Sequence, residues 1–209
     1  MLPEGTTLAQ FTDQYIQSSQ KVGPSMADDI KNAAFLAVVF AMFCMAAYIL
    51  LRFRDISFSV GAFASVAVTT LCIISFYTLL WKVLPFSMEV DQTFIAAILT
   101  IIGYSINDTV VVFDRIRETI GLYPKRDRYQ VINDALNSTL SRTFNTSLTT
   151  LVVVLCIFIL GGATIRSFTF AILLGIIIGT YSTLFVATPI AYELQKKKIN
   201  KKAAAEAGK

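Results

Sequence analysis

The sequence contains no histidine, which excludes any metal site, general base or pH switch built on an imidazole. It also lacks the signatures of P-loop nucleotide-binding proteins, serine hydrolases and zinc proteases, so we expect neither ATP binding nor enzymatic catalysis. Its three cysteines form no CxxC pair and lie in apolar stretches, which argues against a disulfide framework or a zinc site. They are interpreted as small packing residues: Cys44, Cys72 and Cys156. No metal and no other cofactor is therefore expected.

Charged residues are also scarce. They make up 15% of the 209 residues, whereas hydrophobic residues make up 55%; a soluble domain carries roughly 25% charged residues. The mean hydropathy is +0.64 and the net charge is +4. The first 26 residues are polar, with no apolar core of the kind found in a signal peptide. This composition indicates a protein whose main solvent is a lipid bilayer.

Five apolar stretches are long enough to cross a membrane, which takes ~20 residues in a helix. They cover about 32–51, 57–81, 93–113, 143–160 and 168–192. The sequence therefore predicts an all-α membrane protein, with a five-helix transmembrane bundle over residues 28–192. No feature suggests nucleic-acid binding.

Lys and Arg residues indicate how the bundle is oriented. They are concentrated in the first turn, in the 114–141 loop and in the 193–209 tail, and are few in the alternate segments. Because basic residues favour the cytoplasmic side, we expect the N-terminus outside and the C-terminus in the cytoplasm. The 114–141 loop has apolar residues at helical spacing, which predicts an amphipathic surface helix: Tyr129, Ile132, Leu136 and Leu140. The Lys- and Ala-rich tail is predicted to be disordered.

Asp108 stands within the third apolar stretch. An ionised carboxylate in hydrocarbon costs ~2.5–3.5 kcal/mol even on insertion scales, so such residues usually face the bundle interior and have a function. The functional interpretation is a proton-carrying or ion-pairing carboxylate. The alternative is a helix end that leaves the membrane early, since Asp114 and Arg115 follow closely.

Arg142 opens a polar stripe at the start of the fourth stretch. It shares one helix face with Asn145, Thr146 and Thr149, and such a face should turn toward another helix or a water-filled cleft. We therefore predict an Asp108–Arg142 pair, whose carboxyl group is balanced between burial and a neighbouring cation and can take up and lose a proton. The alternative is a static salt bridge that orients two helices. The supporting polar residues are predicted to be Tyr104, Ser105, Asn107, Asn145, Thr146 and Thr149.

Two further polar or small-residue patterns are less specific. Gly175 and Gly179 form a GxxxG motif in the fifth stretch, which is typical of close helix packing. The hydroxyl groups of the second stretch are expected to bond to their own backbone: Ser65, Thr69, Thr70 and Ser75.

These residues belong to longer motifs that resemble the SecF family and the SecF half of fused SecDF proteins. The motifs are GYSINDTVVVFDRIRE at 103–118, LNSTLSRT at 136–143, the 161–168 segment with Gly161–Gly162, and GTYS at 179–182. Val22-Gly23-Pro24 is similar to the family's junction between its external domain and its helices. The resemblance covers nearly all of residues 22–192.

The resemblance implies a subunit of the resistance-nodulation-division superfamily in the bacterial cytoplasmic membrane. Such a subunit would pair with SecD beside the SecYEG channel and use the proton gradient to promote late export of preproteins; sodium is not excluded as the coupling ion. Asp108 and Arg142 fall on the family's proton-pathway positions.

Three departures from the family pattern follow. The family has six spans in a SecF half, so the five here correspond to spans 2–6, and residues 1–27 correspond to a remnant of the external domain and linker. A His-Asp pair that the family often carries is replaced by Val68 and Thr69, and Ala27 stands near the junction's second glycine. Two alternative functions remain open: a proton-coupled exporter of small molecules or lipids, and a scaffold that uses no energy.

Overall fold

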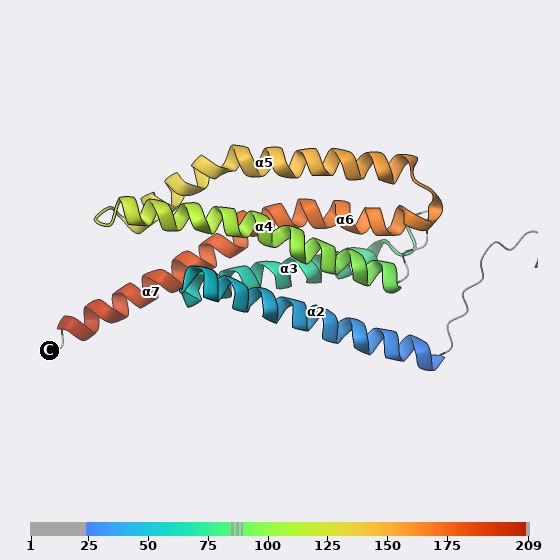
Figure 1. The fold of residues 1–209 in the computed structure, drawn as a ribbon, viewed down its shortest axis with the longest axis horizontal. Coiled ribbons are helices and arrows are strands. Elements are labelled where there is room, and N and C mark those ends of the chain that lie inside the picture. The colour runs from blue at the N-terminus through green and yellow to red at the C-terminus, as the bar shows by residue number, and fades with distance from the viewer. Residues whose placement is uncertain (1–23, 85, 87, 89, 208–209) are drawn as a thin grey trace, which may run out of the picture. The chain divides into compact units, whose positions relative to one another are not determined.

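The computed structural model describes residues 24–207 except 85, 87 and 89, and this part of the chain is helical without any β-strand. The elements in order are α2 (Pro24–Phe53), α3 (Ile56–Leu80), α4 (Gln92–Leu122), α5 (Arg128–Leu160), α6 (Ala163–Ser182), the π-helical turn η1 (Thr183–Ala187) and α7 (Thr188–Ala207) (Figure 1). Five helical segments are long and apolar enough to cross a membrane: 32–53, 56–80, 92–122, 128–160 and 165–201. The predicted all-α, five-span fold class is confirmed.

The chain divides into two compact units after Phe35. Of the first unit, the described residues 24–35 form the first turns of α2. The second unit holds the rest of the helices and all of the residues discussed below. Most of the predicted external-domain remnant at 1–27 lies outside the described residues.

Aspartates begin three of the helices. The side chains of Asp55, Asp91 and Asp127 each accept a hydrogen bond from a backbone N–H in the first turn of α3, α4 and α5 respectively, at 3.1, 2.9 and 3.4 Å. These caps supply partners for N–H groups that a helix start leaves free. At the other end of α5, Gly161 and Gly162 make the tight turn into α6.

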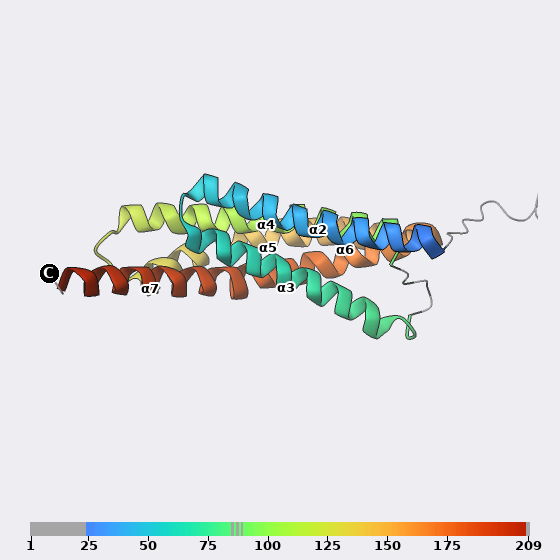
Figure 2. The same cartoon turned by 90° about the horizontal axis from the view of Figure 1, so that it is seen from below.

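Within the second unit, α4, α5 and α6 pack on one another, and α3 packs on α6, η1 and α7 (Figure 1; Figure 2). An aromatic cluster of Phe53, Phe58 and Phe113 fills the space between α2, α3 and α4, with ring centroids 4.8–6.1 Å apart. Toward the other end of α3, Tyr77 packs against Phe94 and donates a hydrogen bond to the Ser167 carbonyl. The packing brings the polar residues of α4, α5 and α6 to the middle of the unit.

Two predictions about the polar segments are wrong. The 114–141 loop does not form a separate surface helix, because α4 continues to Leu122 and α5 already begins at Arg128. Of the apolar residues expected on that helix, Ile132 is buried in the bundle, whereas Tyr129 is exposed. The tail is also helical as far as Ala207, since Ala, Lys and Glu are strong helix formers and α7 simply extends through them.

The cysteines do not have the packing role expected for them. Cys44 and Cys156 are exposed on the chain's own surface and Cys72 is half-buried. Their side chains contribute to the outward apolar surface of the helices instead of to the core.

Candidate functional site

Asp108 lies on the buried face of α4. Its side chain is 6% exposed, and Ser105, Thr109 and Val112 on the same face are also buried. The helix continues for more than three turns beyond it to Leu122. The carboxylate therefore faces the bundle interior and does not mark an early helix end.

The partner of Asp108 comes from α5. Ser147 Oγ donates a hydrogen bond to Asp108 Oδ2 at 3.3 Å, and it also lies 2.7 Å from Thr180 Oγ1 of α6. Thr180 Oγ1 in turn donates to the Ile176 carbonyl at 2.8 Å. One carboxyl group and two hydroxyl groups from three helices thus form a continuous chain, which we call the Asp108 relay.

The Asp108 relay can accommodate both forms of the carboxyl group. When Asp108 is ionised, Ser147 donates to it, and the Thr180 hydroxyl can turn from the Ile176 carbonyl to donate to Ser147. When Asp108 carries a proton, it can donate to Ser147, which then donates to Thr180. Each hydroxyl has one hydrogen and two lone pairs, so the exchange requires only rotation of two hydroxyl groups. The geometry suits a group that gains and loses a proton.

The Asp108–Arg142 ion pair predicted from the sequence is not present. Among the described residues the ion pairs are those of Arg52, Arg115, Arg126 and Lys198, and Arg142 is exposed. The reason is the rotation of α5. Its buried face carries Thr139, Thr143 and Ser147 at four-residue spacing, which turns the adjacent stripe with Arg142 away from α4. Arg142 precedes Ser147 by five residues, about 7.5 Å along the helix.

The other predicted polar residues are divided between the interior and the surface. Tyr104 reaches α5, where its hydroxyl donates to the Thr146 carbonyl at 3.5 Å and to Thr150 Oγ1 at 3.3 Å. Thr146 itself is half-buried. Asn107, Asn145 and Thr149 are exposed on the surface of the chain. The site as built therefore contains Tyr104, Ser105 and Asp108, but not the outer stripe of α5.

Several hydroxyl groups in the interior bond across helices, to partners that the sequence spacing does not specify. Thr109 Oγ1 lies 3.0 Å from Thr183 Oγ1 in η1. Ser65 Oγ donates to Ser182 Oγ at 3.0 Å, so this serine links α3 to α6 and does not bond only to its own helix. The run Thr180-Tyr181-Ser182-Thr183 is the sequence signal for this cluster, but its spacing does not show which hydroxyl faces which helix.

The π-helical turn η1 stands beside this cluster. A π turn leaves backbone groups without their usual partners, and such turns are frequent at functional sites. Here Thr188 Oγ1 donates to the Thr183 carbonyl at 3.2 Å. The second-span positions Val68 and Thr69 contribute no ionisable group, and Thr69 donates to the Ser65 carbonyl of its own helix.

The GxxxG glycines face α4. A Cβ at Gly175 would lie 2.4 Å from the side chain of Ile101, and one at Gly179 would lie 3.4 Å from Ser105 Oγ. Ser105 Oγ is buried and has no hydrogen-bond partner within the described part of the chain. The described residues also contain no group of three or more Cys, Asp or Glu side chains that could hold a metal ion.

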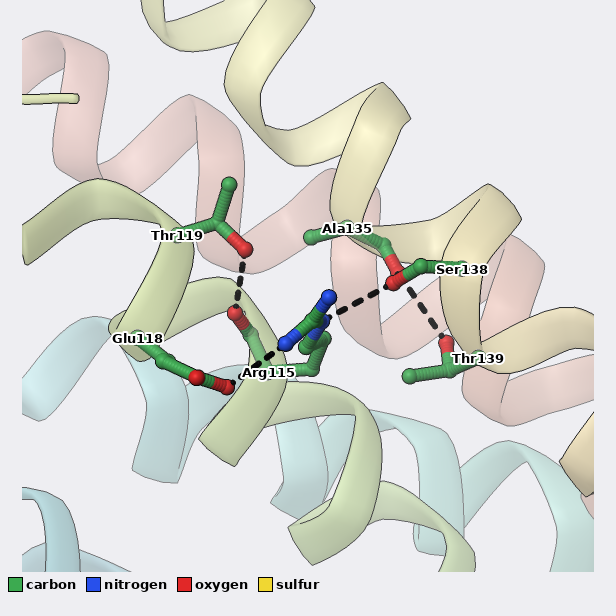
Figure 3. A network of polar contacts seen from close by, with 6 residues as sticks. All are labelled: Arg115, Glu118, Thr119, Ala135, Ser138 and Thr139. Carbon is green, nitrogen blue, oxygen red and sulfur yellow. Dashed lines mark hydrogen bonds and ion pairs between the residues drawn. The ribbon is translucent and has the colours of Figure 1, made fainter. Parts of the chain in front are cut away.

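A second polar network joins α4 and α5 beyond the Asp108 relay (Figure 3). Arg115 donates through Nε to Ser138 Oγ at 3.0 Å and pairs with Glu118 at 2.9 Å. Ser138 and Thr139 in turn donate to the Ala135 carbonyl. Arg115 belongs to the 103–118 motif and Ser138 to the 136–143 motif, so these two motifs are brought into contact at this point.

Comparison with known proteins gives a consistent result. Residues 5–197 match the family described as "Protein export membrane protein SecD/SecF, C-terminal". The "Protein translocase subunit SecF" of Rhodothermus marinus is 46% identical over 186 residues, which is 89% of this chain and 60% of that protein. The SecF subunit of Petrotoga mobilis is 40% identical over 190 residues, covering 90% of this chain and 61% of that protein.

A solved structure is similar as well. The "Crystal structure of SecDF in Super-membrane-facing form" superimposes with a TM-score of 0.75 at 33% identity, covering 95% of this chain and 27% of the solved one. The chain thus spans about three fifths of the length of the curated relatives and about a quarter of the solved protein.

Proposed function

The chain belongs to the SecD/SecF C-terminal family of protein export membrane proteins, and we propose that it is the membrane part of an accessory subunit of the Sec translocase. It is a multi-pass protein of the bacterial cytoplasmic membrane. In the proposed function it uses the proton gradient to promote the late stage of preprotein export. Its proposed partners are a SecD-like subunit, the SecYEG channel and the translocating preprotein.

The single observation that carries this proposal is the Asp108 relay. A carboxyl group that is 6% exposed in a membrane-spanning helix, with a serine hydroxyl as its contact, is costly to keep as a fixed anion. A carboxyl group kept only for structure would be expected to have a cation in contact. The arrangement therefore favours reversible protonation over a static salt bridge.

Arg142 has a different role in this proposal from the one expected at first. It forms no ion pair with Asp108 in this arrangement, so its attraction for the carboxylate would change if α5 shifted or rotated relative to α4. Such a shift would alter how readily Asp108 binds a proton, and protonation would in turn favour one helix arrangement. Moving one charge through 100 mV supplies ~2.3 kcal/mol, which is enough to bias a helix rearrangement.

The experiment is Asp108→Asn introduced at the chromosomal locus, so that the protein keeps its native partners. Asn keeps the size of the side chain and cannot carry the charge. The matched control is Asp114→Asn, because Asp114 is an exposed carboxylate of the same helix that pairs with Arg52 at 3.3 Å. Export of a secreted preprotein is followed by pulse-chase, together with the amount of the chain in the membrane.

The proposal expects slower export in Asp108→Asn at unchanged membrane level, with little effect of Asp114→Asn. Unchanged export in both variants would indicate that the chain is a scaffold that uses no energy. Normal export with altered resistance to small toxic compounds would instead indicate an exporter of small molecules or lipids. Repeating the assay after selective collapse of the proton or the sodium gradient distinguishes the two coupling ions.

A further inference from the structure

A pocket of about 350 Å³ opens at one end of the bundle, away from the Asp108 relay. The turn between α2 and α3, the end of α4, the middle of α7 and the start of α5 surround it. Because α2 and α3 are both long enough to span a membrane, the turn that joins them lies at a membrane surface. The positive charge of this end predicts that the surface is the cytoplasmic one.

The pocket is strongly basic. Its charged lining consists of Arg54, Arg117, Arg128, Lys198 and a single carboxylate, Asp55, which leaves a formal charge of +3. Lys198 is paired with Asp55 at 3.4 Å. The three arginines have no carboxylate within ion-pair distance among the described residues.

Neighbouring arginines outside the pocket are different. Arg52, Arg115 and Arg126 each form an ion pair with a carboxylate, at 3.3, 2.9 and 3.2 Å. These three arginines are therefore neutralised by carboxylates, whereas the three that line the pocket have no carboxylate partner among the described residues; Arg117 donates only to the Arg52 carbonyl, at 3.4 Å. Such a concentration of positive charge attracts an anion from outside the chain.

Arg54 adds an independent observation. Its backbone has φ 54°, in the left-handed region, and its N–H donates to the Leu50 carbonyl at 2.8 Å to end α2. Glycine is the usual residue at this position of a helix end, because a Cβ is unfavourable there. The chain keeps a guanidinium where a glycine would fold more easily, which points to a use for the side chain.

The floor of the pocket is apolar. Phe53 and Phe58 are each 4% exposed and pack at 5.5 Å between ring centroids, so they form a rigid base. Ile120 and Ile199 extend the apolar lining. A basic rim above an apolar floor fits a molecule that has an anionic group at one end and hydrocarbon at the other.

We propose that this pocket binds the phosphate headgroup of an anionic phospholipid. Guanidinium groups bind phosphate oxygens through paired, charge-assisted hydrogen bonds, and basic pockets between membrane-spanning helices on the cytoplasmic side recognise anionic headgroups. The lipid's glycerol and upper acyl carbons would lie against the phenylalanine floor. The proposal does not depend on proton coupling by Asp108.

The test uses the whole 209-residue chain in detergent, titrated with phosphatidylglycerol and observed by native mass spectrometry. A double variant of the pocket, Arg54→Gln with Arg117→Gln, is compared with a control double variant, Lys82→Gln with Arg166→Gln. The control residues lie at the other end of the bundle, and both double variants remove two positive charges. We expect phosphatidylglycerol to bind the pocket variant at least about tenfold more weakly, and the control variant almost as well as the unchanged chain.

Titrations with other ligands show which kind of anion the pocket binds. Phosphatidylcholine and inorganic phosphate should each bind much more weakly than phosphatidylglycerol. Equal losses in both double variants would overturn the proposal in favour of general charge attraction. Inorganic phosphate binding as tightly as the lipid would indicate a site for a soluble anion, and preference for a glutamate-rich peptide would indicate a site for a protein segment.

Arg54→Gly tests whether weaker lipid binding could be caused by misfolding of the variant. This variant removes the guanidinium but relieves the left-handed backbone, so its melting temperature should rise while phosphatidylglycerol binding falls. A fall in both quantities would show that Arg54 is needed for folding and would overturn its assignment to the lipid.

Discussion

Replacing Gly61 by alanine tests how closely α3 packs on the π turn and α7. A Cβ built at Gly61 would lie 2.6 Å from the backbone oxygen of Ala187, and 3.3 Å from the Cβ of Ala191. A carbon–oxygen contact normally requires about 3.3 Å or more. Because the obstructing atom belongs to a backbone and not to a flexible side chain, the two helical segments would have to move apart.

The magnitude follows from a matched variant in the same bundle. Gly103 lies within α4, and a Cβ there would meet no atom within 4 Å. Both substitutions gain the same ~1 kcal/mol of helix propensity, so this gain cancels when Gly61→Ala is compared with Gly103→Ala. The overpacking cost at Gly61 remains, and we expect Gly61→Ala to be about 1–3 kcal/mol less stable than Gly103→Ala.

The assay is reversible unfolding in mixed micelles with increasing dodecyl sulfate, followed by the loss of helical circular dichroism. Gly103→Ala should unfold at the same or a higher denaturant fraction than the unchanged chain, and Gly61→Ala at a clearly lower one. If the two variants unfold together, the close approach of α3 to the π turn does not exist and the packing derived from it is wrong.

Substitutions at three further positions test the polar contacts. Ser147→Ala removes the hydroxyl that donates to Asp108 and should slow export in the pulse-chase assay, whereas Ser147→Thr keeps the hydroxyl and should retain most of it. Tyr77→Phe removes the hydrogen bond to the Ser167 carbonyl and should lower the free energy of unfolding by about 1 kcal/mol in the micelle assay. An unchanged free energy of unfolding would show that a water molecule donates to this carbonyl in place of the tyrosine hydroxyl. Arg142→Gln should change the free energy of unfolding by less than ~0.5 kcal/mol, because the side chain is exposed. The same variant should nevertheless slow export, and Arg142→Lys, which keeps the charge, should slow export less.

The helices could be predicted well from the sequence because lipid imposes a simple requirement. Runs of ~20 apolar residues must form helices there. Four of the five predicted spans lie within the helical segments found, and the 57–81 span ends one residue beyond its segment, 56–80. The residues at which the helices begin and end were harder to predict. Polar residues at 114–122 and 128–142 continue α4 and α5, since a helix does not have to stop where the membrane does.

The candidate site was predicted only in part. Asp108 could be singled out because a carboxylate in an apolar run is rare, and its burial agrees with that choice. The partner was wrong, because Ser147 and Arg142 lie on different faces of one helix, about 140° apart around its axis, and a rotation of α5 decides which of them faces Asp108. That rotation is set by contacts with α6, which involve Thr180 and are not encoded in the spacing within α5. The family resemblance identified at the motifs is confirmed.

The outer face of α5 has a consequence for the life of the protein in the cell. Asn145 and Thr149 lie within the fourth span and are not covered by the described helices, so in a lone copy they would face acyl chains. We expect a copy without a covering surface to be less stable, and less stable copies are removed faster by cellular proteases. The abundance of this chain should then follow the supply of whatever covers α5, so that excess copies are cleared without a dedicated regulator.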